Sequence, residues 1–413
     1  MIICGQGEGA WRPIPYNMGI IFTGMKSIAI DCTIAKLMGI DLDSIWENYN
    51  ALWMGKLIFK WRMHVMATPE QYKEKELDNC TLIKAVLMLA VCLGHCANFW
   101  TGGWFNVVTP KYQSDTLIFI SKWLNSFHIY CFVLISGYLY SYNRNECGKY
   151  NVYKTFITKK TKRLILPYVF VTISFVIPIE SFLYDYSLEQ IIEKYVLCES
   201  PSHLWFLWML FWLFIIIWPL TKKFSNDWMA IVISTMSYVI GTLGGLRIPN
   251  YFCIFTSLSY VPFFIIGMKL REKRNWFIRK VSLTIYCVLY IICFMAWSYF
   301  ADGINSIEKI IYIGLGLVLH IIGAISIFFL LQRLANIITW EKSKLWGFLS
   351  KRSMMVYLYH QQLIYFSILW FNGLVPPFFN FLLNFGVALV GALIISSALL
   401  RFRYTRFFFN NRN

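Results

Sequence analysis

Apolar runs long enough to cross a bilayer follow one another along most of the chain, separated by short polar and basic segments. A helix needs about 20 mostly apolar residues to cross the hydrocarbon layer of a membrane. The runs lie at residues 82–100, 123–142, 164–182, 203–220, 228–246, 251–270, 281–300, 310–331, 353–371 and 377–400. Backbone groups in lipid must be hydrogen-bonded within their own segment, so such runs form helices. The pattern predicts an all-α membrane protein, built as a bundle of about ten transmembrane helices.

The first 65 residues do not share this pattern. The segment MGIIFTG at residues 18–24 is typical of a short buried strand, and Ser27 can cap the helix that follows it. One strand and one helix without neighbouring strands bury little apolar surface. We expect residues 1–65 to be a short α/β-like segment: a fragment of a soluble α/β domain, a fusion remnant, or the result of a start set too early, with Met66 as the alternative start. Residues 66–413 are then the polytopic membrane domain.

Composition and charge support a membrane protein. Hydrophobic residues make up 58% of the chain and charged residues 14%, which excludes a soluble globular protein. The net charge of +17 comes from Lys and Arg residues that lie between the apolar runs, so they do not form one patch for nucleic acid. The loops predicted on one side hold 24 of them, at residues 143–163, 222–223, 269–280, 333–352 and 401–412. Because such residues gather on the inner side, we expect a multi-pass protein of the plasma membrane with both termini in the cytoplasm.

The first run, LIKAVLMLAVCLGHCANFW at residues 82–100, holds two ionisable side chains besides its cysteines, Lys84 and His95. They are eleven residues apart, so a helix places them within about 20° around its axis and about 16 Å apart along it. A histidine in lipid is costly, and Gly94 allows a helix or substrate to come close. We predict that His95 is the reactive group of an internal site and that Lys84 lies at one membrane face. The alternative is a histidine hydrogen-bonded within the bundle.

Other runs also carry polar side chains. His128 and Ser136 fall close to one face of the second run, so we expect His128 to point into the bundle. The alternative is an interfacial histidine that is solvated by lipid headgroups. Further ionisable residues in or beside the runs are Glu180, His203, His320 and His360. We interpret His320 as a packing residue or as a residue that is hydrogen-bonded within the bundle.

The spacing of Lys84 and His95 resembles the motif that opens acyltransferase family 3, a basic residue and a histidine separated by ten residues. Three further segments resemble later signatures of this family: FHIYCFVLISGY at residues 127–138, SHLWFL at 202–207 and SMMVYLYHQQLI at 353–364. The family comprises polytopic membrane proteins. The resemblance implies transfer of acyl groups, mostly acetyl, from a cytoplasmic thioester to sugars and other extracytoplasmic acceptors.

Residues 10–60 carry a separate resemblance. The segment PIPYNMGIIFTGMKSIAIDCTIAKLMGID resembles the closing portion of a soluble family of uncharacterised proteins, often associated with ferredoxin-like iron–sulfur modules. No cysteine cluster for such a cofactor accompanies the segment, so we carry no function over from it.

A basic cluster lies just before the third run, at Lys159, Lys160, Lys162 and Arg163. The family has a pair of basic residues with two others between them, which Lys159 and Lys162, or Lys160 and Arg163, match. Such cations make charge-assisted contacts with phosphates, and the resemblance implies those of acyl-coenzyme A. The alternative is anchoring of the loop on the cytoplasmic side. Lysine lacks the fork-like phosphate grip of the arginine that is frequent at this place.

The eleven cysteines are scattered and lack paired extracellular spacings, so we expect no disulfide framework. Cys92, His95 and Cys96 share a helix face that can in principle bind a metal. Small cysteines in membrane helices are commonly packing residues, and we predict no metal site.

These observations predict a membrane O-acyltransferase, and in particular an O-acetyltransferase. It moves an acyl group from cytoplasmic acyl-CoA to a hydroxyl of an extracytoplasmic or lipid-linked glycan, and the Gly-rich aromatic loop after the first run fits such an acceptor. Acyl-CoA is then a co-substrate, and no bound cofactor is required. Transfer needs a base for the hydroxyl proton, and burial keeps a histidine unprotonated.

We assign His95 as the general base or transient acyl carrier, and Lys84 as the residue that steers the donor. His128, Ser136 and His360 orient groups or donate hydrogen bonds, whereas Glu180 and His203 lie towards the outer face. The competing hypothesis is a transporter or flippase in which intramembrane histidines relay protons. Few runs contain the acidic residues or Gly/Pro breaks that proton-driven carriers use, which disfavours it.

Overall fold

The computed structural model describes residues 4–6, 14–16, 69–274, 283–301, 305–337 and 343–409. The chain divides into two compact units, Met1–Lys75 and Glu76–Asn413. In the first, β1 (Cys4–Gln6) pairs antiparallel with β2 (Ile14–Tyr16). The predicted strand at residues 18–24 and the helix after it lie outside the described residues.

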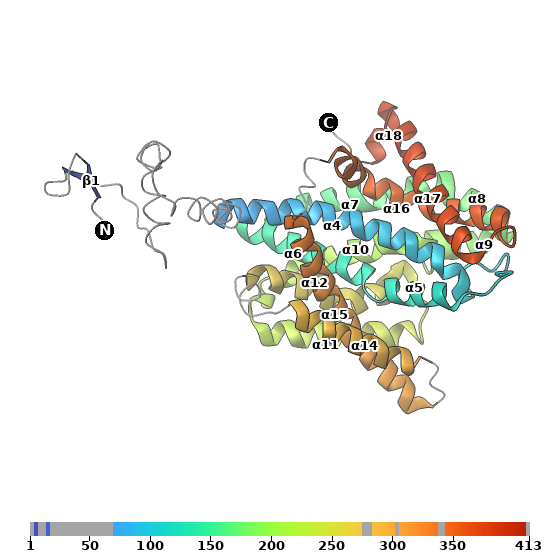
Figure 1. Cartoon of the computed structure of the whole chain (residues 1–413), viewed down its shortest axis with the longest axis horizontal. Coiled ribbons are helices and arrows are strands. Elements are labelled where there is room, and N and C mark those ends of the chain that lie inside the picture. The colour runs from blue at the N-terminus through green and yellow to red at the C-terminus, as the bar shows by residue number, and fades with distance from the viewer. Residues whose placement is uncertain are drawn as a thin grey trace, which may run out of the picture. The chain divides into compact units, whose positions relative to one another are not determined.

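The second unit is built of helices, of which the first, α4, begins within the last residues of the first unit; Figure 1 shows the helices in order along the chain. They are α4 (Pro69–Asn98), α5 (Asp115–Asn125), α6 (His128–Ser141), α7 (Tyr153–Val171), α8 (Ile177–Tyr184), α9 (Leu188–Ile191), α10 (Trp205–Leu220), α11 (Asp227–Gly245), α12 (Ile254–Glu272), α14 (Leu283–Tyr299), α15 (Ser306–Ile337), α16 (Lys344–Phe371), α17 (Pro377–Leu399) and α18 (Arg403–Phe408). Short 3-10 or π segments join or extend them: η1 (Phe99–Thr101), η2 (Tyr142–Glu146), η3 (Thr172–Val176), η4 (Ile192–Val196), η5 (Ser202–Leu204), η6 (Lys223–Ser225) and η7 (Tyr251–Cys253).

Eight helical segments of the described chain are long and apolar enough to cross a membrane. They are Asn79–Thr101, Asp115–Glu146, Tyr153–Tyr184, Ser202–Leu220, Asp227–Arg247, Tyr251–Glu272, Ile307–Ile337 and Pro377–Leu399. The other two predicted runs form α14, with 17 residues, and α16, with 28. The prediction of an all-α membrane protein is confirmed, and the eight segments together with α14 and α16 agree with a bundle of about ten helices.

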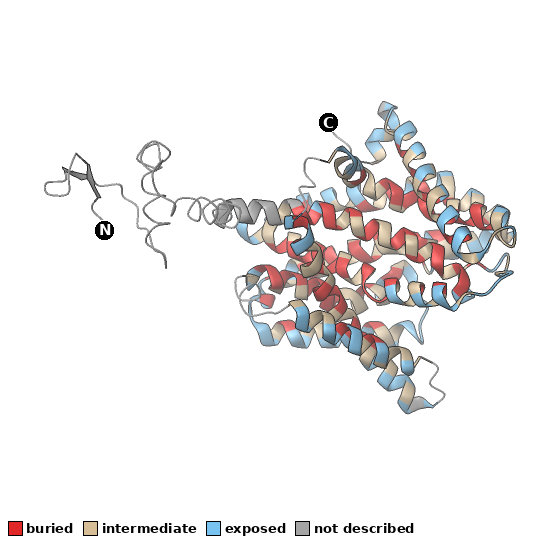
Figure 2. Cartoon of the chain, in the orientation of Figure 1, coloured by how far each residue is buried: buried red, intermediate tan, exposed pale blue. Residues whose placement is uncertain are grey.

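The outer faces of several helices are apolar. Ile231 on α11, Ile291 on α14 and Ile394 on α17 are exposed, together with many other large apolar side chains. Figure 2 shows such exposed positions on the outward faces of the helices, with buried positions between the helices. Soluble monomers do not expose apolar surface on this scale, so these faces contact lipid.

The second run differs from its prediction because it starts earlier and is interrupted. Helix α5 begins at Asp115, where the Ser114 side chain accepts a hydrogen bond from the Leu117 backbone N–H. Phe127 then leaves the helical conformation, with φ −136° and ψ −31°, and α6 restarts at His128. The sequence gives no glycine or proline at this break, which is why the run looked continuous.

The basic cluster before the third run is helical, whereas the sequence suggested a loop. Helix α7 starts at Tyr153, so residues 159–163 occupy its second and third turns. The helix continues through η3 into α8 even though Pro167 lies within it. The cluster therefore has helical geometry, in which residues three apart share a face.

Helices α6 and α12 cross in close contact through two glycines. A Cβ atom added to Gly137 lies 2.0 Å from the Phe264 carbonyl oxygen, and one added to Gly267 lies 1.9 Å from the Leu134 carbonyl oxygen. Small residues at such crossings let helix backbones approach each other in membranes. This crossing places α6, which forms one wall of the cavity described below, against the rest of the bundle.

We expect Gly137→Ala and Gly267→Ala each to lower the midpoint of thermal unfolding in detergent. The added methyl group meets backbone that cannot move aside alone, and overpacking of this kind costs about 1–3 kcal/mol. Gly386→Ala on α17 is the matched control, since no atom lies within 4 Å of its added Cβ. Equal midpoints for all three variants would show that the close crossing does not exist.

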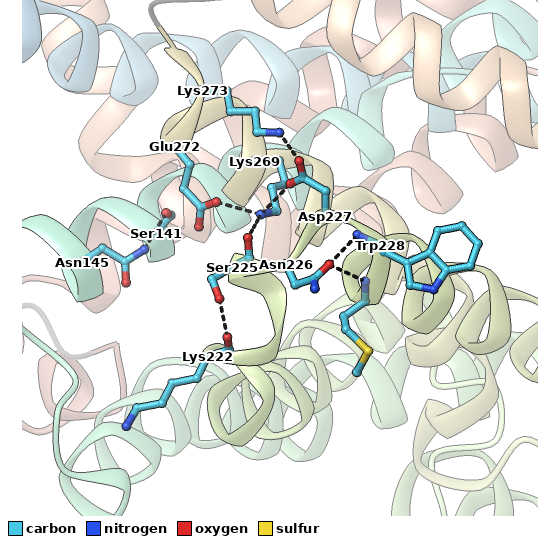
Figure 3. Close-up of polar contacts among 11 residues, drawn as sticks. Ser141, Asn145, Lys222, Ser225, Asn226, Asp227, Trp228, Lys269, Glu272 and Lys273 are labelled. Atoms are coloured by element: carbon cyan, nitrogen blue, oxygen red, sulfur yellow. Dashed lines mark hydrogen bonds and ion pairs between the residues drawn. The ribbon is translucent and has the colours of Figure 1, made fainter.

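An exposed ionic cluster joins the start of α11 to the end of α12 (Figure 3). The Asn226 side chain accepts hydrogen bonds from the backbone N–H groups of Trp228 and Met229 and so caps α11. The Asp227 carboxylate lies 3.1 Å from the Lys269 ammonium and also pairs with Lys273. At this place, cations and carboxylates neutralise one another.

Candidate active site

One face of α4 lines an internal cavity of about 240 Å³. The lining residues from this helix are Lys84, Met88, Val91 and His95, at intervals of four, three and four residues. This is the spacing of a single helix face. The other walls come mainly from α6, α7, α10 and α16. Lys84 and His95, about 16 Å apart along the helix axis, therefore line the same cavity.

Three cations gather at the Lys84 end of the cavity. Lys160 and Arg163 on α7 line it together with Lys84. The Lys160 ammonium lies 3.6 Å from the centre of the Phe214 ring and 5.1 Å from that of Tyr150. Among the described residues, no Asp or Glu lines the cavity, in contrast to the neutralised cluster of Figure 3. This end of the cavity therefore has a positive potential that favours an anion.

The other two cations of the basic cluster point elsewhere. Lys159 and Lys162 are exposed and do not line the cavity. Because residues three apart share a helix face, Lys160 and Arg163 form one pair and Lys159 and Lys162 the other. Of the two pairs that match the predicted motif, the structure places Lys160 and Arg163 at the cavity.

At the other end of the cavity, His95 contacts His360 of α16. The His95 Nδ1 and His360 Nε2 atoms are 2.9 Å apart, and the two rings are stacked with centres 4.9 Å apart. The His360 Nδ1 atom lies 2.7 Å from the Tyr357 carbonyl oxygen, so this nitrogen carries a proton and donates it. In the neutral ring, His360 Nε2 then accepts a hydrogen bond from His95 Nδ1–H. This leaves the lone pair of His95 on Nε2, and His95 lines the cavity.

A third histidine completes the group. His203, in η5, also lines the cavity, and its ring lies edge-on to that of His360 with centres 5.1 Å apart. Its Nε2–H donates to the Leu358 carbonyl oxygen at 3.2 Å. Its Nδ1 is buried without a hydrogen-bond partner among the described residues. His95, His203 and His360 come from three separate elements, and the fold brings them together.

Residues 77–401 match the family model whose description is an acyltransferase domain. The chain belongs to acyltransferase family 3. It is therefore a membrane acyltransferase, and the match covers all the elements that line the cavity. In comparisons with curated proteins and with solved structures, no protein matches the chain.

Two predicted site residues of the acyltransferase lie on α6. The Ser136 side chain lines the cavity and donates to the Phe132 carbonyl oxygen at 2.9 Å. His128 is fully buried and is not among the residues that line the cavity. Its Nδ1–H donates to the Leu124 carbonyl oxygen at 2.5 Å. Gly94 of α4 passes over this ring, 3.7 Å from His128 Cε1 to the position of an added Cβ. His128 thus lies behind α4, in the contact between helices.

Glu180 also does not line the cavity of the acyltransferase. Its carboxylate is buried and accepts hydrogen bonds from Lys194 at 2.9 Å, Tyr195 at 2.5 Å and Gln362 at 3.2 Å. Burial lowers the pKa of Lys194, but the Glu180 carboxylate and the Tyr186 hydroxyl raise it more, so the pKa lies above its ordinary value. This ion pair ties α8 and η4 to Gln362, which lies two residues beyond His360 on α16.

Some cavity residues of the acyltransferase were not singled out from the sequence. Tyr357 lines the cavity and lies three residues before His360, so helical spacing from that histidine is a signal that points to it. Tyr150 also lines the cavity, from a loop between helices, and no periodic pattern marks it. By contrast, His320 stacks on Tyr130 with ring centres 3.9 Å apart and does not line the cavity.

The thiols near His95 do not form a metal site with it in this structure. In the part of the chain that the structure describes, no group of three or more His, Cys, Asp or Glu side chains is placed to hold a metal ion. Cys92 and Cys96 are buried on α4 as free thiols and pack in a cluster with Phe99, Ile364 and Ile368. Their contacts are those of packing residues.

Proposed function

We propose that this acyltransferase takes an acyl group, in particular acetyl, from acyl-CoA and transfers it to a hydroxyl group, with His95 as the general base. A single observation carries the proposal: one cavity, which no Asp or Glu of the described residues lines, joins three cations to a histidine whose Nε2 lone pair is available. The phosphates of coenzyme A match the cations. The thioester at the other end of the same molecule then lies towards His95.

The volume of the cavity indicates which part of acyl-CoA it can hold. A volume of about 240 Å³ is smaller than that of pockets that enclose a whole drug-sized ligand, roughly 300–1,000 Å³. The narrow acyl-pantetheine arm therefore enters the cavity while the nucleotide stays at its mouth. Arg163 suits the mouth because it is exposed and still lines the cavity.

The chemistry at His95 is acyl transfer through a tetrahedral intermediate. His95 Nε2 removes the proton of the acceptor hydroxyl as the oxygen bonds to the thioester carbon. The carbon–sulfur bond then breaks, and the coenzyme A thiolate takes the proton back from the imidazolium. His360 holds His95 in the tautomer that this step needs, and Ser136 is a polar group in the same cavity.

We infer the sidedness from charge. The cationic end of the cavity belongs on the cytoplasmic side, where Lys and Arg gather and acyl-CoA is present. Both termini are then cytoplasmic, and the acceptor approaches His95 from the outer side of the plasma membrane. An extracytoplasmic or lipid-linked glycan has the required hydroxyl groups, and Trp104 and Phe105 lie in the loop on that side.

Turnover of acetyl-CoA in the absence of a transmembrane gradient distinguishes the proposed acyltransferase from a transporter or flippase. Protein purified in detergent is incubated with acetyl-CoA labelled in the acetyl group, and release or transfer of the label is measured. The proposal predicts loss of label from coenzyme A that depends on His95. A carrier that only moves a solute or glycan leaves acetyl-CoA intact.

Replacement of His360 tests how the base is oriented. His360→Phe removes the acceptor for His95 Nδ1–H, and loss of such a hydrogen bond to a group that becomes charged costs about 1.5–3 kcal/mol, or roughly 10- to 100-fold. We expect kcat to fall by that factor while the KM for acetyl-CoA stays unchanged. His360→Gln, whose side-chain oxygen can still accept, is expected to recover part of the rate. Equal rates for His360→Phe and wild type would exclude an orienting role.

A further inference from the structure

The side of His95 away from the cationic end is covered by Trp104. The two ring centres are 5.6 Å apart and the rings are tilted by 46°. Trp104 also lies 5.2 Å from the Tyr365 ring of α16. Residues 102–114, the loop between η1 and α5, do not line the cavity. His95 thus stands between the cavity and a loop that closes over it.

This loop is fixed at several points. Phe105 is buried and stacks on Tyr365 with ring centres 4.5 Å apart. The Asn372 side chain, just after α16, makes two hydrogen bonds to the loop backbone: its oxygen accepts from Lys111 N–H at 3.1 Å, and its amide donates to the Thr109 carbonyl at 2.8 Å. The Asn372 side chain therefore holds the loop by two hydrogen bonds, one as acceptor and one as donor.

The loop also has a point where its backbone can turn. Gly102 and Gly103 adopt φ of 76° and 73°, a region that favours glycine, and no atom lies within 4 Å of a Cβ added to either. The packed anchors lie beyond this pair, at Trp104, Phe105 and the segment held by Asn372. The two glycines therefore leave the first part of the loop free to change direction once its anchors are released.

We infer that residues 102–114 form a lid over the acceptor side of His95, that Asn372 is its latch, and that Trp104 covers the side of the His95 ring from which the acceptor approaches. This inference rests on the proposed function, because it assigns the route of the acceptor to the same histidine. The closed lid keeps water away from His95 while acyl-CoA is bound. An alcohol with an apolar ring face, as in a sugar, can replace Tyr365 or His95 as the stacking partner of Trp104 when the lid lifts.

The latch predicts a side reaction. When the lid opens without an acceptor, a water oxygen bonds to the thioester carbon and His95 takes the water proton. The carbon–sulfur bond breaks, coenzyme A leaves as a thiol with that proton, and free acetate is released. We expect Asn372→Ala to raise acetate release from labelled acetyl-CoA about tenfold over wild type, because two hydrogen bonds of the closed state are lost. Asn372→Asp, which can still accept from Lys111 N–H, is expected to fall between the two.

Two readouts test the lid in the full-length protein. Acetate release must rise in Asn372→Ala and Trp104→Ala, and the rise must disappear when His95→Ala is added. Amide hydrogen exchange of residues 103–113 must become faster in Asn372→Ala, and this readout needs no chemistry. Exchange equal to wild type overturns the latch. Faster exchange with no increase in acetate release, in a protein whose turnover depends on His95, overturns the lid. If turnover does not depend on His95 even in wild type, the proposed function itself fails.

Discussion

Replacement of His95 by alanine is expected to lower acetyl transfer from acetyl-CoA by about a thousandfold. General base catalysis contributes typically 10²–10⁴-fold. Among the described residues that line the cavity, His203 is the other histidine, and its free nitrogen, Nδ1, is buried and so is not available to the acceptor hydroxyl. The loss appears in kcat, because the cations that bind the donor lie at the other end of the cavity. The measurement is transfer or release of labelled acetate by purified protein.

The control for this variant is a histidine outside the cavity. His320 stacks on Tyr130, and its Nδ1 donates to the Ser126 carbonyl at 2.8 Å. His320→Phe keeps an aromatic ring at this place and should leave the rate near wild type. Both variants must elute from size exclusion as wild type does. Wild-type turnover by folded His95→Ala protein would remove His95 from the mechanism.

Charge reversal at the mouth of the cavity is expected to cause a large loss of affinity for acetyl-CoA. The double variant Lys160→Glu/Arg163→Glu is expected to raise the KM for acetyl-CoA at least 100-fold and to change kcat only a few-fold. Each charge-assisted contact to a phosphate contributes about 1.5–3 kcal/mol, roughly 10- to 100-fold in affinity, and the two reversals also repel the donor. The dependence of KM on ionic strength should become weaker as well.

The same helix supplies a matched control. Lys159→Glu/Lys162→Glu changes the net charge by the same amount within the same two turns of α7, but these side chains are exposed and do not line the cavity. Its KM for acetyl-CoA should stay within a few-fold of wild type. If both double variants raise the KM for acetyl-CoA equally, the cations act through the general surface charge and the cavity is not the donor site.

The periodicity of the first run was sufficient to relate Lys84 to His95, because both lie on one continuous helix. The sequence does not decide between Lys159 with Lys162 and Lys160 with Arg163, because the predicted loop has no fixed face. The start of α7 at Tyr153 decides it, because the helix gives each pair its own face. Local spacing thus predicts relations within a helix when the helix boundaries are right.

The sequence did not predict which distant helices contact each other. His95 and His360 are 265 residues apart and meet through packing of α4 against α16, which no periodic pattern encodes. The prediction that His128 points into the bundle agrees with its burial, but His128 does not line the cavity. Glu180, which was predicted to support the site, pairs with Lys194 in a contact that depends on how η4 folds back on α8, and the sequence does not predict that contact.

The most direct test of the account is an experimental structure of the protein in lipid with acetyl-CoA bound. We expect the coenzyme A phosphates beside Lys84, Lys160 and Arg163, with the pantetheine arm in the cavity and the thioester beside His95. Coenzyme A bound at another surface, or a thioester separated from the His95 ring by a closed wall of side chains, would contradict it.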